Sequence, residues 1–282
     1  MPAAPDIYFA YDGSLNGDWV ARYAIRAAAR MASRKLHIVH VLDGRLPEGV
    51  FNDRLIGLER ECKARDVDLQ TTIVPRRAEV AASIVEQIPA GPGSLLYCGT
   101  RARSRRGFIA GTVAARLLKQ SHCHTIAVRV VNPGLLGDPR DVLLPLSGRS
   151  DTIERCVFLA ELFLPDLDSI HLLRVATLSG FSFHYLTRKK AAHLKREINE
   201  WTRNAAAALR DQLQERCPRL DYRAQVSDDW TREILVQANK LKARMILMGA
   251  SDRSLPGRYL HGNLIERVLR ETSSDVGIYR LL

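Results

Sequence analysis

Lys35-Leu-His-Ile-Val-His-Val41 is a short, mostly apolar run, and a similar run, Ser169-Ile-His-Leu-Leu-Arg-Val175, follows 134 residues later. Three other pairs of segments repeat in the same order along the chain: Ile7–Gly13 with Val142–Gly148, Ser94–Gly99 with Arg244–Gly249, and Gly111–Leu118 with Gly262–Leu269. The offset grows from 134 or 135 to 150 or 151 after the second strand run. We therefore predict a duplicated domain of about 140 residues, with an insertion at about 178–216 of the second copy.

Each copy alternates short apolar runs with longer stretches of helical period, which is typical of parallel strands joined by helices. In the first copy the runs are 7–11, 36–42, 69–74, 94–98 and 125–131, and the helical patterns are about 15–33, 51–66, 78–88 and 111–121. We predict an α/β fold of two tandem doubly wound domains, each a five-stranded parallel sheet with helices on both faces. The predicted limits are 1–131 and 140–282, joined by the Pro- and Gly-rich linker 132–139.

Composition excludes several classes of protein. The chain has 282 residues, 46% of them hydrophobic, which is a globular balance, and no apolar run is long enough for a membrane span. The first residues lack the pattern of a secretory signal, and the five cysteines include no C-x-x-C pair, so we expect a reduced, cytoplasmic protein. The net charge of +11 favours anionic partners, but the two copies share it almost equally. We expect no specific nucleic-acid recognition.

The inserted segment carries an amphipathic helical pattern. Ala191, Leu194, Ile198 and Trp201 recur at spacings of three or four residues, with charged residues between them. We expect this stripe to pack against the domain and the charged face to be solvated, in preference to a membrane or partner helix.

Two loops of the first copy have the chemistry of an anion site. In open parallel sheets, ligands bind beyond the carboxyl ends of the strands. Asp12-Gly13-Ser14 follows the first strand, and the loop from Gly99 to Gly111 follows the fourth, holds four arginines and leads into a helix at Thr112. Backbone amides left accessible at glycines, a helix N-terminus and guanidinium groups together favour a phosphate ligand. A solvated basic turn without a ligand would have the same sequence pattern.

These residues also resemble the signatures of the universal stress protein family: Asp-Gly-Ser after strand one and Gly-x2-Gly-x9-Gly-[Ser/Thr] after strand four. The resemblance covers nearly the whole chain, as a tandem of two such domains. It implies the adenine nucleotide alpha hydrolase-like fold and two domains that pair within one chain, with a homodimer as a further assembly. In nucleotide-binding members the aspartate and the end of strand two hold adenosine, and the glycine loop holds the phosphates of ATP, with Mg2+.

Carried over by position, the resemblance gives a nucleotide site in each copy. In the first copy Ala102 replaces the second glycine of the motif. The second copy departs more, because Ser147 replaces the aspartate, Asp252 the second glycine and Asn263 the Ser/Thr. We therefore expect the first copy to be the nucleotide site. The first site comprises Asp12, Gly13, Val41, Gly99, Ala102, Gly111 and Thr112, and the second Ser147, Val175, Gly249, Asp252, Gly262 and Asn263.

Three functions remain open from the sequence. The first is an ATP-binding regulatory module of the stress response with an unknown protein partner and at most slow ATP hydrolysis. The second is a ligand-free interaction scaffold built from two degenerate domains. The third, a minor alternative, is an ATP pyrophosphatase-like enzyme, suggested by Ser147-Gly-Arg-Ser-Asp-Thr152. We predict neither catalytic nor metal-ligating residues.

Overall fold

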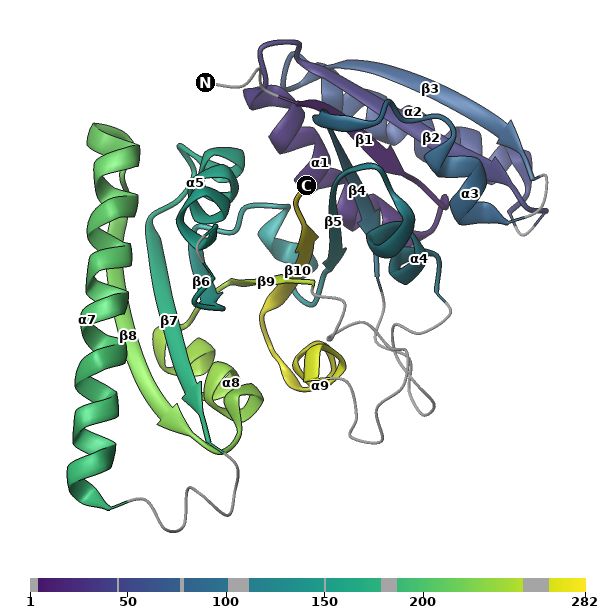
Figure 1. Ribbon diagram of the computed structural model, residues 1–282. Helices are drawn as coiled ribbons and strands as arrows, with labels where there is room; N and C mark the ends of the chain where they lie inside the picture. Colours follow the sequence, from purple (N-terminus) through teal and green to yellow (C-terminus); the bar gives the residue numbers. More distant parts are fainter. Residues whose placement is uncertain are drawn as a thin grey trace. The chain divides into compact units, whose positions relative to one another are not determined.

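The computed structural model describes residues 5–44, 46–76, 79–100, 112–149, 151–178, 187–250 and 264–282 (Figure 1). The chain divides into two compact units. The first takes in the described residues of Met1–Asp138, Gly249–Glu266 and Val276–Leu282, and the second those of Pro139–Met248 and Arg267–Asp275.

The first unit is built on a sheet in the order β3-β2-β1-β4-β5-β10. Its first five strands are β1 (Asp6–Ala10), β2 (Lys35–Leu42), β3 (Asp68–Pro75), β4 (Gly91–Gly99) and β5 (Cys123–Arg129), and all of them run parallel. Their bounds confirm the five apolar runs predicted from the sequence. Central strands are buried almost throughout, whereas the edge strand β3 is mostly exposed and correspondingly polar.

Helices cover both faces of this sheet. They are α1 (Leu15–Arg30), α2 (Glu48–Lys63), α3 (Val80–Val85) and α4 (Val113–Gln120). Helix α1 packs on β1, β2 and β4 beside α2, while α3 and α4 contact each other and pack on β2, β3 and β5. The four predicted helices are confirmed, although the predicted starts of the last two, residues 78 and 111, lie outside the described residues.

The second unit repeats this construction. Its strands are β6 (Asp141–Leu146), β7 (Ser169–Thr177), β8 (Arg219–Ser227) and β9 (Met245–Gly249), in the parallel order β9-β6-β7-β8. This is the same succession as β4-β1-β2-β3 of the first unit. The α/β fold with a parallel sheet, built twice along the chain, is therefore confirmed.

The helices of the second copy are α5 (Thr152–Phe163), α7 (Arg188–Leu213), α8 (Trp230–Leu241) and α9 (Leu264–Glu271), with a short 3-10 turn, η2 (Gln214–Arg216), after α7. Helices α5 and α7 contact each other, and α7 and α8 both pack on β7 and β8. The predicted insertion corresponds in part to α7, which has 26 residues where α2 has 16.

The segment predicted as a linker contains the 3-10 turn η1 (Pro133–Leu135), followed by Leu136 and Gly137, both with positive φ. Arg26 of α1 donates a hydrogen bond to the Leu136 carbonyl at 3.1 Å. A Cβ atom on Gly137 would lie 2.7 Å from the Arg22 backbone, so a glycine is needed for this close approach. The segment is thus held against α1.

Strand β10 (Asp275–Arg280) pairs antiparallel with β5, from Val276 opposite Arg129 to Arg280 opposite Thr125. The Arg280 guanidinium donates to the carbonyls of Leu118, Lys119 and Ser121 at the C-terminal end of α4, at 3.3, 3.1 and 3.1 Å. A cation at this end of a helix is favourable, because the unpaired carbonyls there carry the negative end of the helix dipole. The last strand therefore also fixes the end of α4.

The central strand β4 carries a buried polar group that has no partner among the described residues. Tyr97 in the central strand β4 is fully buried, and its hydroxyl makes no hydrogen bond with any residue that the structure describes. Burial raises the pKa of Tyr97, so the phenol stays protonated. An unsatisfied buried hydroxyl costs stability.

Replacing this tyrosine by phenylalanine should therefore stabilise the protein. We expect Tyr97→Phe to raise the free energy of unfolding by about 1 kcal/mol, measured by urea denaturation. Tyr11→Phe is the matched control, because the Tyr11 hydroxyl donates to Asp18, and its loss should destabilise the protein by about 1.5 kcal/mol or more. A destabilised Tyr97→Phe variant would contradict the assignment of an unsatisfied hydroxyl.

Candidate functional site at the strand ends

The carboxyl ends of β2, β1 and β4 meet at one edge of the first unit's sheet. Ala10 lies opposite Val39 on one side and opposite Cys98 on the other. Val41, Asp12 and Thr100 each follow two residues after these aligned positions in the sequence. Since a doubly wound sheet binds ligands at such an edge, the structure brings together Asp12, Gly13, Val41 and Gly99 as the sequence predicted.

A tight turn presents the Asp12 carboxylate to solvent. Its Oδ1 accepts the Ser14 backbone N–H at 3.0 Å, and Ser14 Oγ in turn accepts the Gly17 N–H at 3.1 Å as the N-cap of α1. Gly13 has φ +69°, a backbone conformation that favours glycine. A Cβ on Gly17 would lie 2.8 Å from Asp12 Oδ1. Two glycines thus make room for a carboxylate at the positive end of a helix.

Several side chains that the sequence analysis missed form hydrogen bonds and ring contacts next to this turn. The Tyr11 hydroxyl and the Arg54 guanidinium both donate to Asp18. Burial and this hydrogen bond raise the pKa of Tyr11. His40 Nδ1 lies 2.9 Å from the Tyr11 carbonyl, which can only accept, so Nδ1 carries a proton, and the His40 ring stacks on Phe51 at 4.0 Å. No sequence motif reveals this cluster, because Tyr11 follows β1 and the other members come from α1, β2 and α2.

Thr100 is a second residue that the sequence analysis missed. It follows Gly99 at the end of β4, is buried, and its Oγ1 has no hydrogen-bond partner in the described part of the chain. Across the loop, Thr112 caps α4, with its Oγ1 accepting the Ala115 N–H at 3.2 Å. The residues between them, including Ala102, Gly111 and the four arginines, lie outside the described residues.

The helices after both glycine loops are anchored by ion pairs at equivalent positions. Arg116 of α4 contacts Glu79, the N-cap of α3, and Arg267 of α9 contacts Asp229, the N-cap of α8. The two acids are 150 residues apart and the two arginines are 151 residues apart. These separations equal the offsets of 150 and 151 between the repeated segments of the two copies. The internal repeat could have revealed this pair from the sequence.

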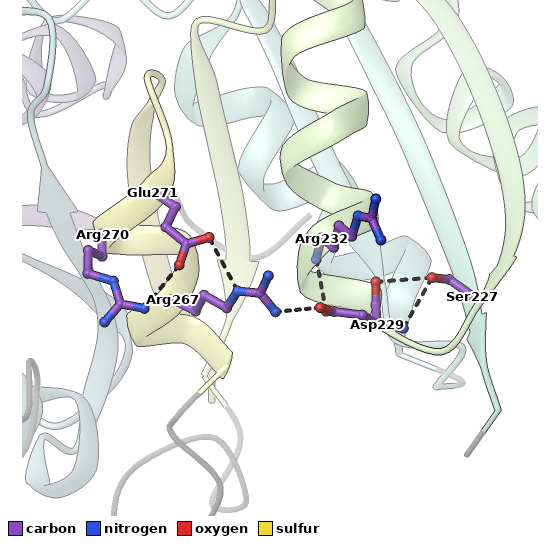
Figure 2. Close-up of polar contacts among 6 residues, drawn as sticks. All are labelled: Ser227, Asp229, Arg232, Arg267, Arg270 and Glu271. Atoms are coloured by element: carbon purple, nitrogen blue, oxygen red, sulfur yellow. Dashed lines mark hydrogen bonds and ion pairs between the residues drawn. The ribbon is translucent and has the colours of Figure 1, made fainter. Parts of the chain in front are cut away.

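In the second copy this ion pair belongs to a larger network (Figure 2). Asp229 Oδ1 accepts the Arg232 backbone N–H at 2.9 Å, and Glu271 accepts hydrogen bonds from Arg267 and Arg270 at 3.3 and 3.0 Å. Burial acts to raise the pKa of Asp229, but the hydrogen bonds from the Arg232 backbone and the Arg267 guanidinium outweigh it, and the pKa is lowered. The charged form of Asp229 is therefore favoured in the folded protein.

The lowered pKa of Asp229 predicts how the free energy of unfolding changes with pH. The charge of Asp229 stabilises the fold above the unfolded pKa of about 4, and the contribution is lost as the pH falls through the lower folded pKa. We expect Asp229→Asn to lower the free energy of unfolding by about 0.5–1 kcal/mol at pH 7, and the difference from wild type to shrink toward zero below about pH 3. Glu215→Gln, at an exposed position, is the control and should behave as wild type. A pH-independent loss in Asp229→Asn would contradict the charge assignment.

The corresponding edge of the second unit is built differently. Ser147, Val175 and Gly249 lie at the ends of neighbouring strands β6, β7 and β9, as predicted, whereas Asp252, Gly262 and Asn263 lie outside the described residues. Gly148 has φ +77°, and a Cβ there would lie 2.6 Å from Arg174 Nη2.

Arg174 covers this glycine. Its Nη1 donates to the Leu146 carbonyl at 2.9 Å, and its guanidinium carbon lies 5.6 Å from the centroid of the Trp201 ring. Burial lowers the pKa of Arg174. Arg174 is the counterpart of His40, because each reaches the carbonyl at the end of the first strand of its copy. The guanidinium fills the space directly against Gly148.

The sequence matches one family. The model of the Universal stress protein family matches twice, over residues 5–129 and 153–280. No curated protein sequence matches the chain. None of the helices that the structure describes has the length and apolar character needed to cross a membrane.

Solved structures share the fold over nearly the full length of the chain. A universal stress protein from Archaeoglobus fulgidus is 13% identical, with 98% of this chain and 96% of that chain covered and a TM-score of 0.59. A putative universal stress protein from Pseudomonas aeruginosa is 16% identical, with 98% and 93% covered and a TM-score of 0.57. The cytoplasmic domain of a prokaryotic cation chloride cotransporter is 10% identical, with 99% and 96% covered and a TM-score of 0.60. At these identities the likeness shows the fold alone.

Proposed function

Because the chain belongs to the universal stress protein family, we propose that its first unit binds an adenine nucleotide, ATP, and that the protein acts as a nucleotide-dependent regulatory module of the stress response. The observation that carries the proposal is the register of Ala10 with Val39 and Cys98, because Asp12, Val41 and Thr100 each follow two residues after these aligned positions.

Each of these groups suits a part of the nucleotide. The exposed Asp12 carboxylate can accept hydrogen bonds from ribose hydroxyls, and the backbone around Val41, near the end of the neighbouring strand β2, would contact the adenine. The buried Thr100 hydroxyl donates to no residue in the described part of the chain, and phosphate oxygens could accept this hydrogen bond. The N-terminus of α4, capped by Thr112, favours negative charge. Mg2+ would accompany the phosphates and offset their charge.

The second unit does not favour the same ligand. Ser147 offers a hydroxyl where the first unit has a carboxylate, and the Arg174 guanidinium covers the glycine beside it. We therefore assign one nucleotide to each chain, in the first unit. The matched pair of positions, Asp12 and Ser147, provides an internal control.

This proposal is tested by titrating the purified chain with ATP and Mg2+ in a calorimeter. We expect one ATP per chain, and an at least tenfold weaker affinity for Asp12→Asn, because hydrogen bonds to a charged acceptor are lost. Ser147→Ala should bind as wild type. Thermal melting of both variants without nucleotide checks that they are folded.

Two results would overturn the assignment. Absence of heat, together with an unchanged melting temperature at millimolar ATP, would exclude nucleotide binding. Weaker binding in Ser147→Ala with none of the loss in Asp12→Asn would place the nucleotide in the second unit.

A further inference from the structure

The first half of α7 (Arg188–Leu213) has no counterpart in the first copy. The equivalent helix α2 (Glu48–Lys63) is ten residues shorter, at 16 residues against 26. The first fully buried residue of α7 is Thr202, and the remaining buried positions follow it toward the C-terminal end of the helix. Figure 1 shows α7 as the long green helix beside β8. The turns before Thr202 therefore gain little from packing on the sheet.

These first turns carry a concentrated positive charge. We call Arg188–Arg196 the cationic segment: it holds five cations and no acid, and the next acid is Glu197. The cations are exposed, and none of them forms an ion pair or a side-chain hydrogen bond with any residue that the structure describes. They are Arg188, Lys189, Lys190, Lys195 and Arg196.

This charge lies at the unfavourable end of the helix. The N-terminus of a helix carries partial positive charge, so acids stabilise the first turn and cations destabilise it. Helix α2 follows the usual preference, with Glu48 in its first turn, whereas the first turn of α7 has no acid. The same fold element thus has opposite charge in the two copies. An anionic surface would remove the repulsion that the cationic segment has in the isolated chain.

Apolar groups accompany these cations. Ala191, Leu194, Ile198 and Trp201 are only half-buried, in contrast to the buried stripe that the sequence analysis expected over this part of the helix. At 100° per residue the five cations spread over three sides of the helix rather than forming one row. In the sequence, the run Phe181-Ser-Phe-His-Tyr-Leu186 lies one residue before the segment. Aromatic residues next to a lysine and arginine cluster are typical of proteins that bind at the surface of a bilayer.

We propose that the cationic segment binds the surface of a bilayer that contains acidic phospholipids. The segment lies on this surface and does not span it, with its lysines and arginines among the headgroups. A nucleic acid is less well matched, because the cations do not follow a single line along which a phosphate backbone could run. The segment belongs to the second unit, and the proposal does not depend on nucleotide binding in the first unit.

The test is co-sedimentation of the full chain with vesicles of phosphatidylcholine alone or with 30% phosphatidylglycerol. We expect binding only to the acidic vesicles, and binding that weakens as salt is raised. Each cation removed should weaken the binding about fivefold, so Lys189→Gln with Lys195→Gln should weaken it about 30-fold. The matched control, Lys63→Gln with Lys119→Gln, removes two exposed lysines from the first unit and should bind as wild type.

A single charge reversal separates folding from binding. Lys190 is three residues after the N-cap Thr187, whose side chain accepts the Lys190 N–H, so Lys190→Glu completes a capping box. We expect this variant to raise the melting temperature by about 1–3 °C and to lower vesicle binding about 30-fold. Loss of binding in a more stable protein cannot be attributed to misfolding.

Three outcomes would overturn the proposal. They are absence of binding to acidic vesicles, equal loss of binding in the cationic-segment and control variants, and equal binding to neutral and acidic vesicles. Tight, salt-sensitive binding to duplex DNA without binding to vesicles would replace the lipid surface by a nucleic acid.

Discussion

Strand β1 lies between β2 and β4, and the parallel hydrogen bonding of these three strands constrains the rest of the first unit. Parallel neighbours require crossover connections, and these connections place helices over both faces, so the strands become continuously apolar. The same alignment brings three carboxyl ends to one edge. Asp12 follows β1 at this edge, and the turn at Gly13 leaves it exposed to solvent.

The two copies share this framework but differ in what fills the strand ends. In each copy the side chain near the end of the second strand reaches the carbonyl at the end of the first, as His40 does with Tyr11 and Arg174 with Leu146. An aromatic ring from the following helix packs against that side chain in both copies. The ion pair that ties the last helix to the preceding N-cap is also present twice. The supporting contacts have thus been kept, while the groups that could face a ligand have changed.

The net positive charge is partly spread over both copies and partly concentrated at the start of α7. The two copies divide the surplus almost equally, and from the sequence only the four arginines between Gly99 and Gly111 were expected to meet an anion. The structure shows that five of the cations lie together on helical turns that bury no residue completely. The expected packing of Ala191, Leu194 and Ile198 is only partly met, because hydrophobic periodicity indicates which face of a helix is apolar but not where its partner surface ends.

Periodicity and internal repetition predicted the duplication, the strands and most helix positions, because these patterns are local properties of the chain. Asp12, Gly13 and Gly99 were predicted as site residues from their places after the strands, and Val41 from the resemblance to the universal stress protein family. The sequence did not indicate Tyr11, Asp18, His40, Arg54 or Thr100 as neighbours of this site. Those residues come together only through strand register and helix packing, which join segments distant in sequence. The tertiary structure alone also showed that the Arg174 guanidinium lies against Gly148 and near the Trp201 ring, since these three residues come from distant parts of the sequence.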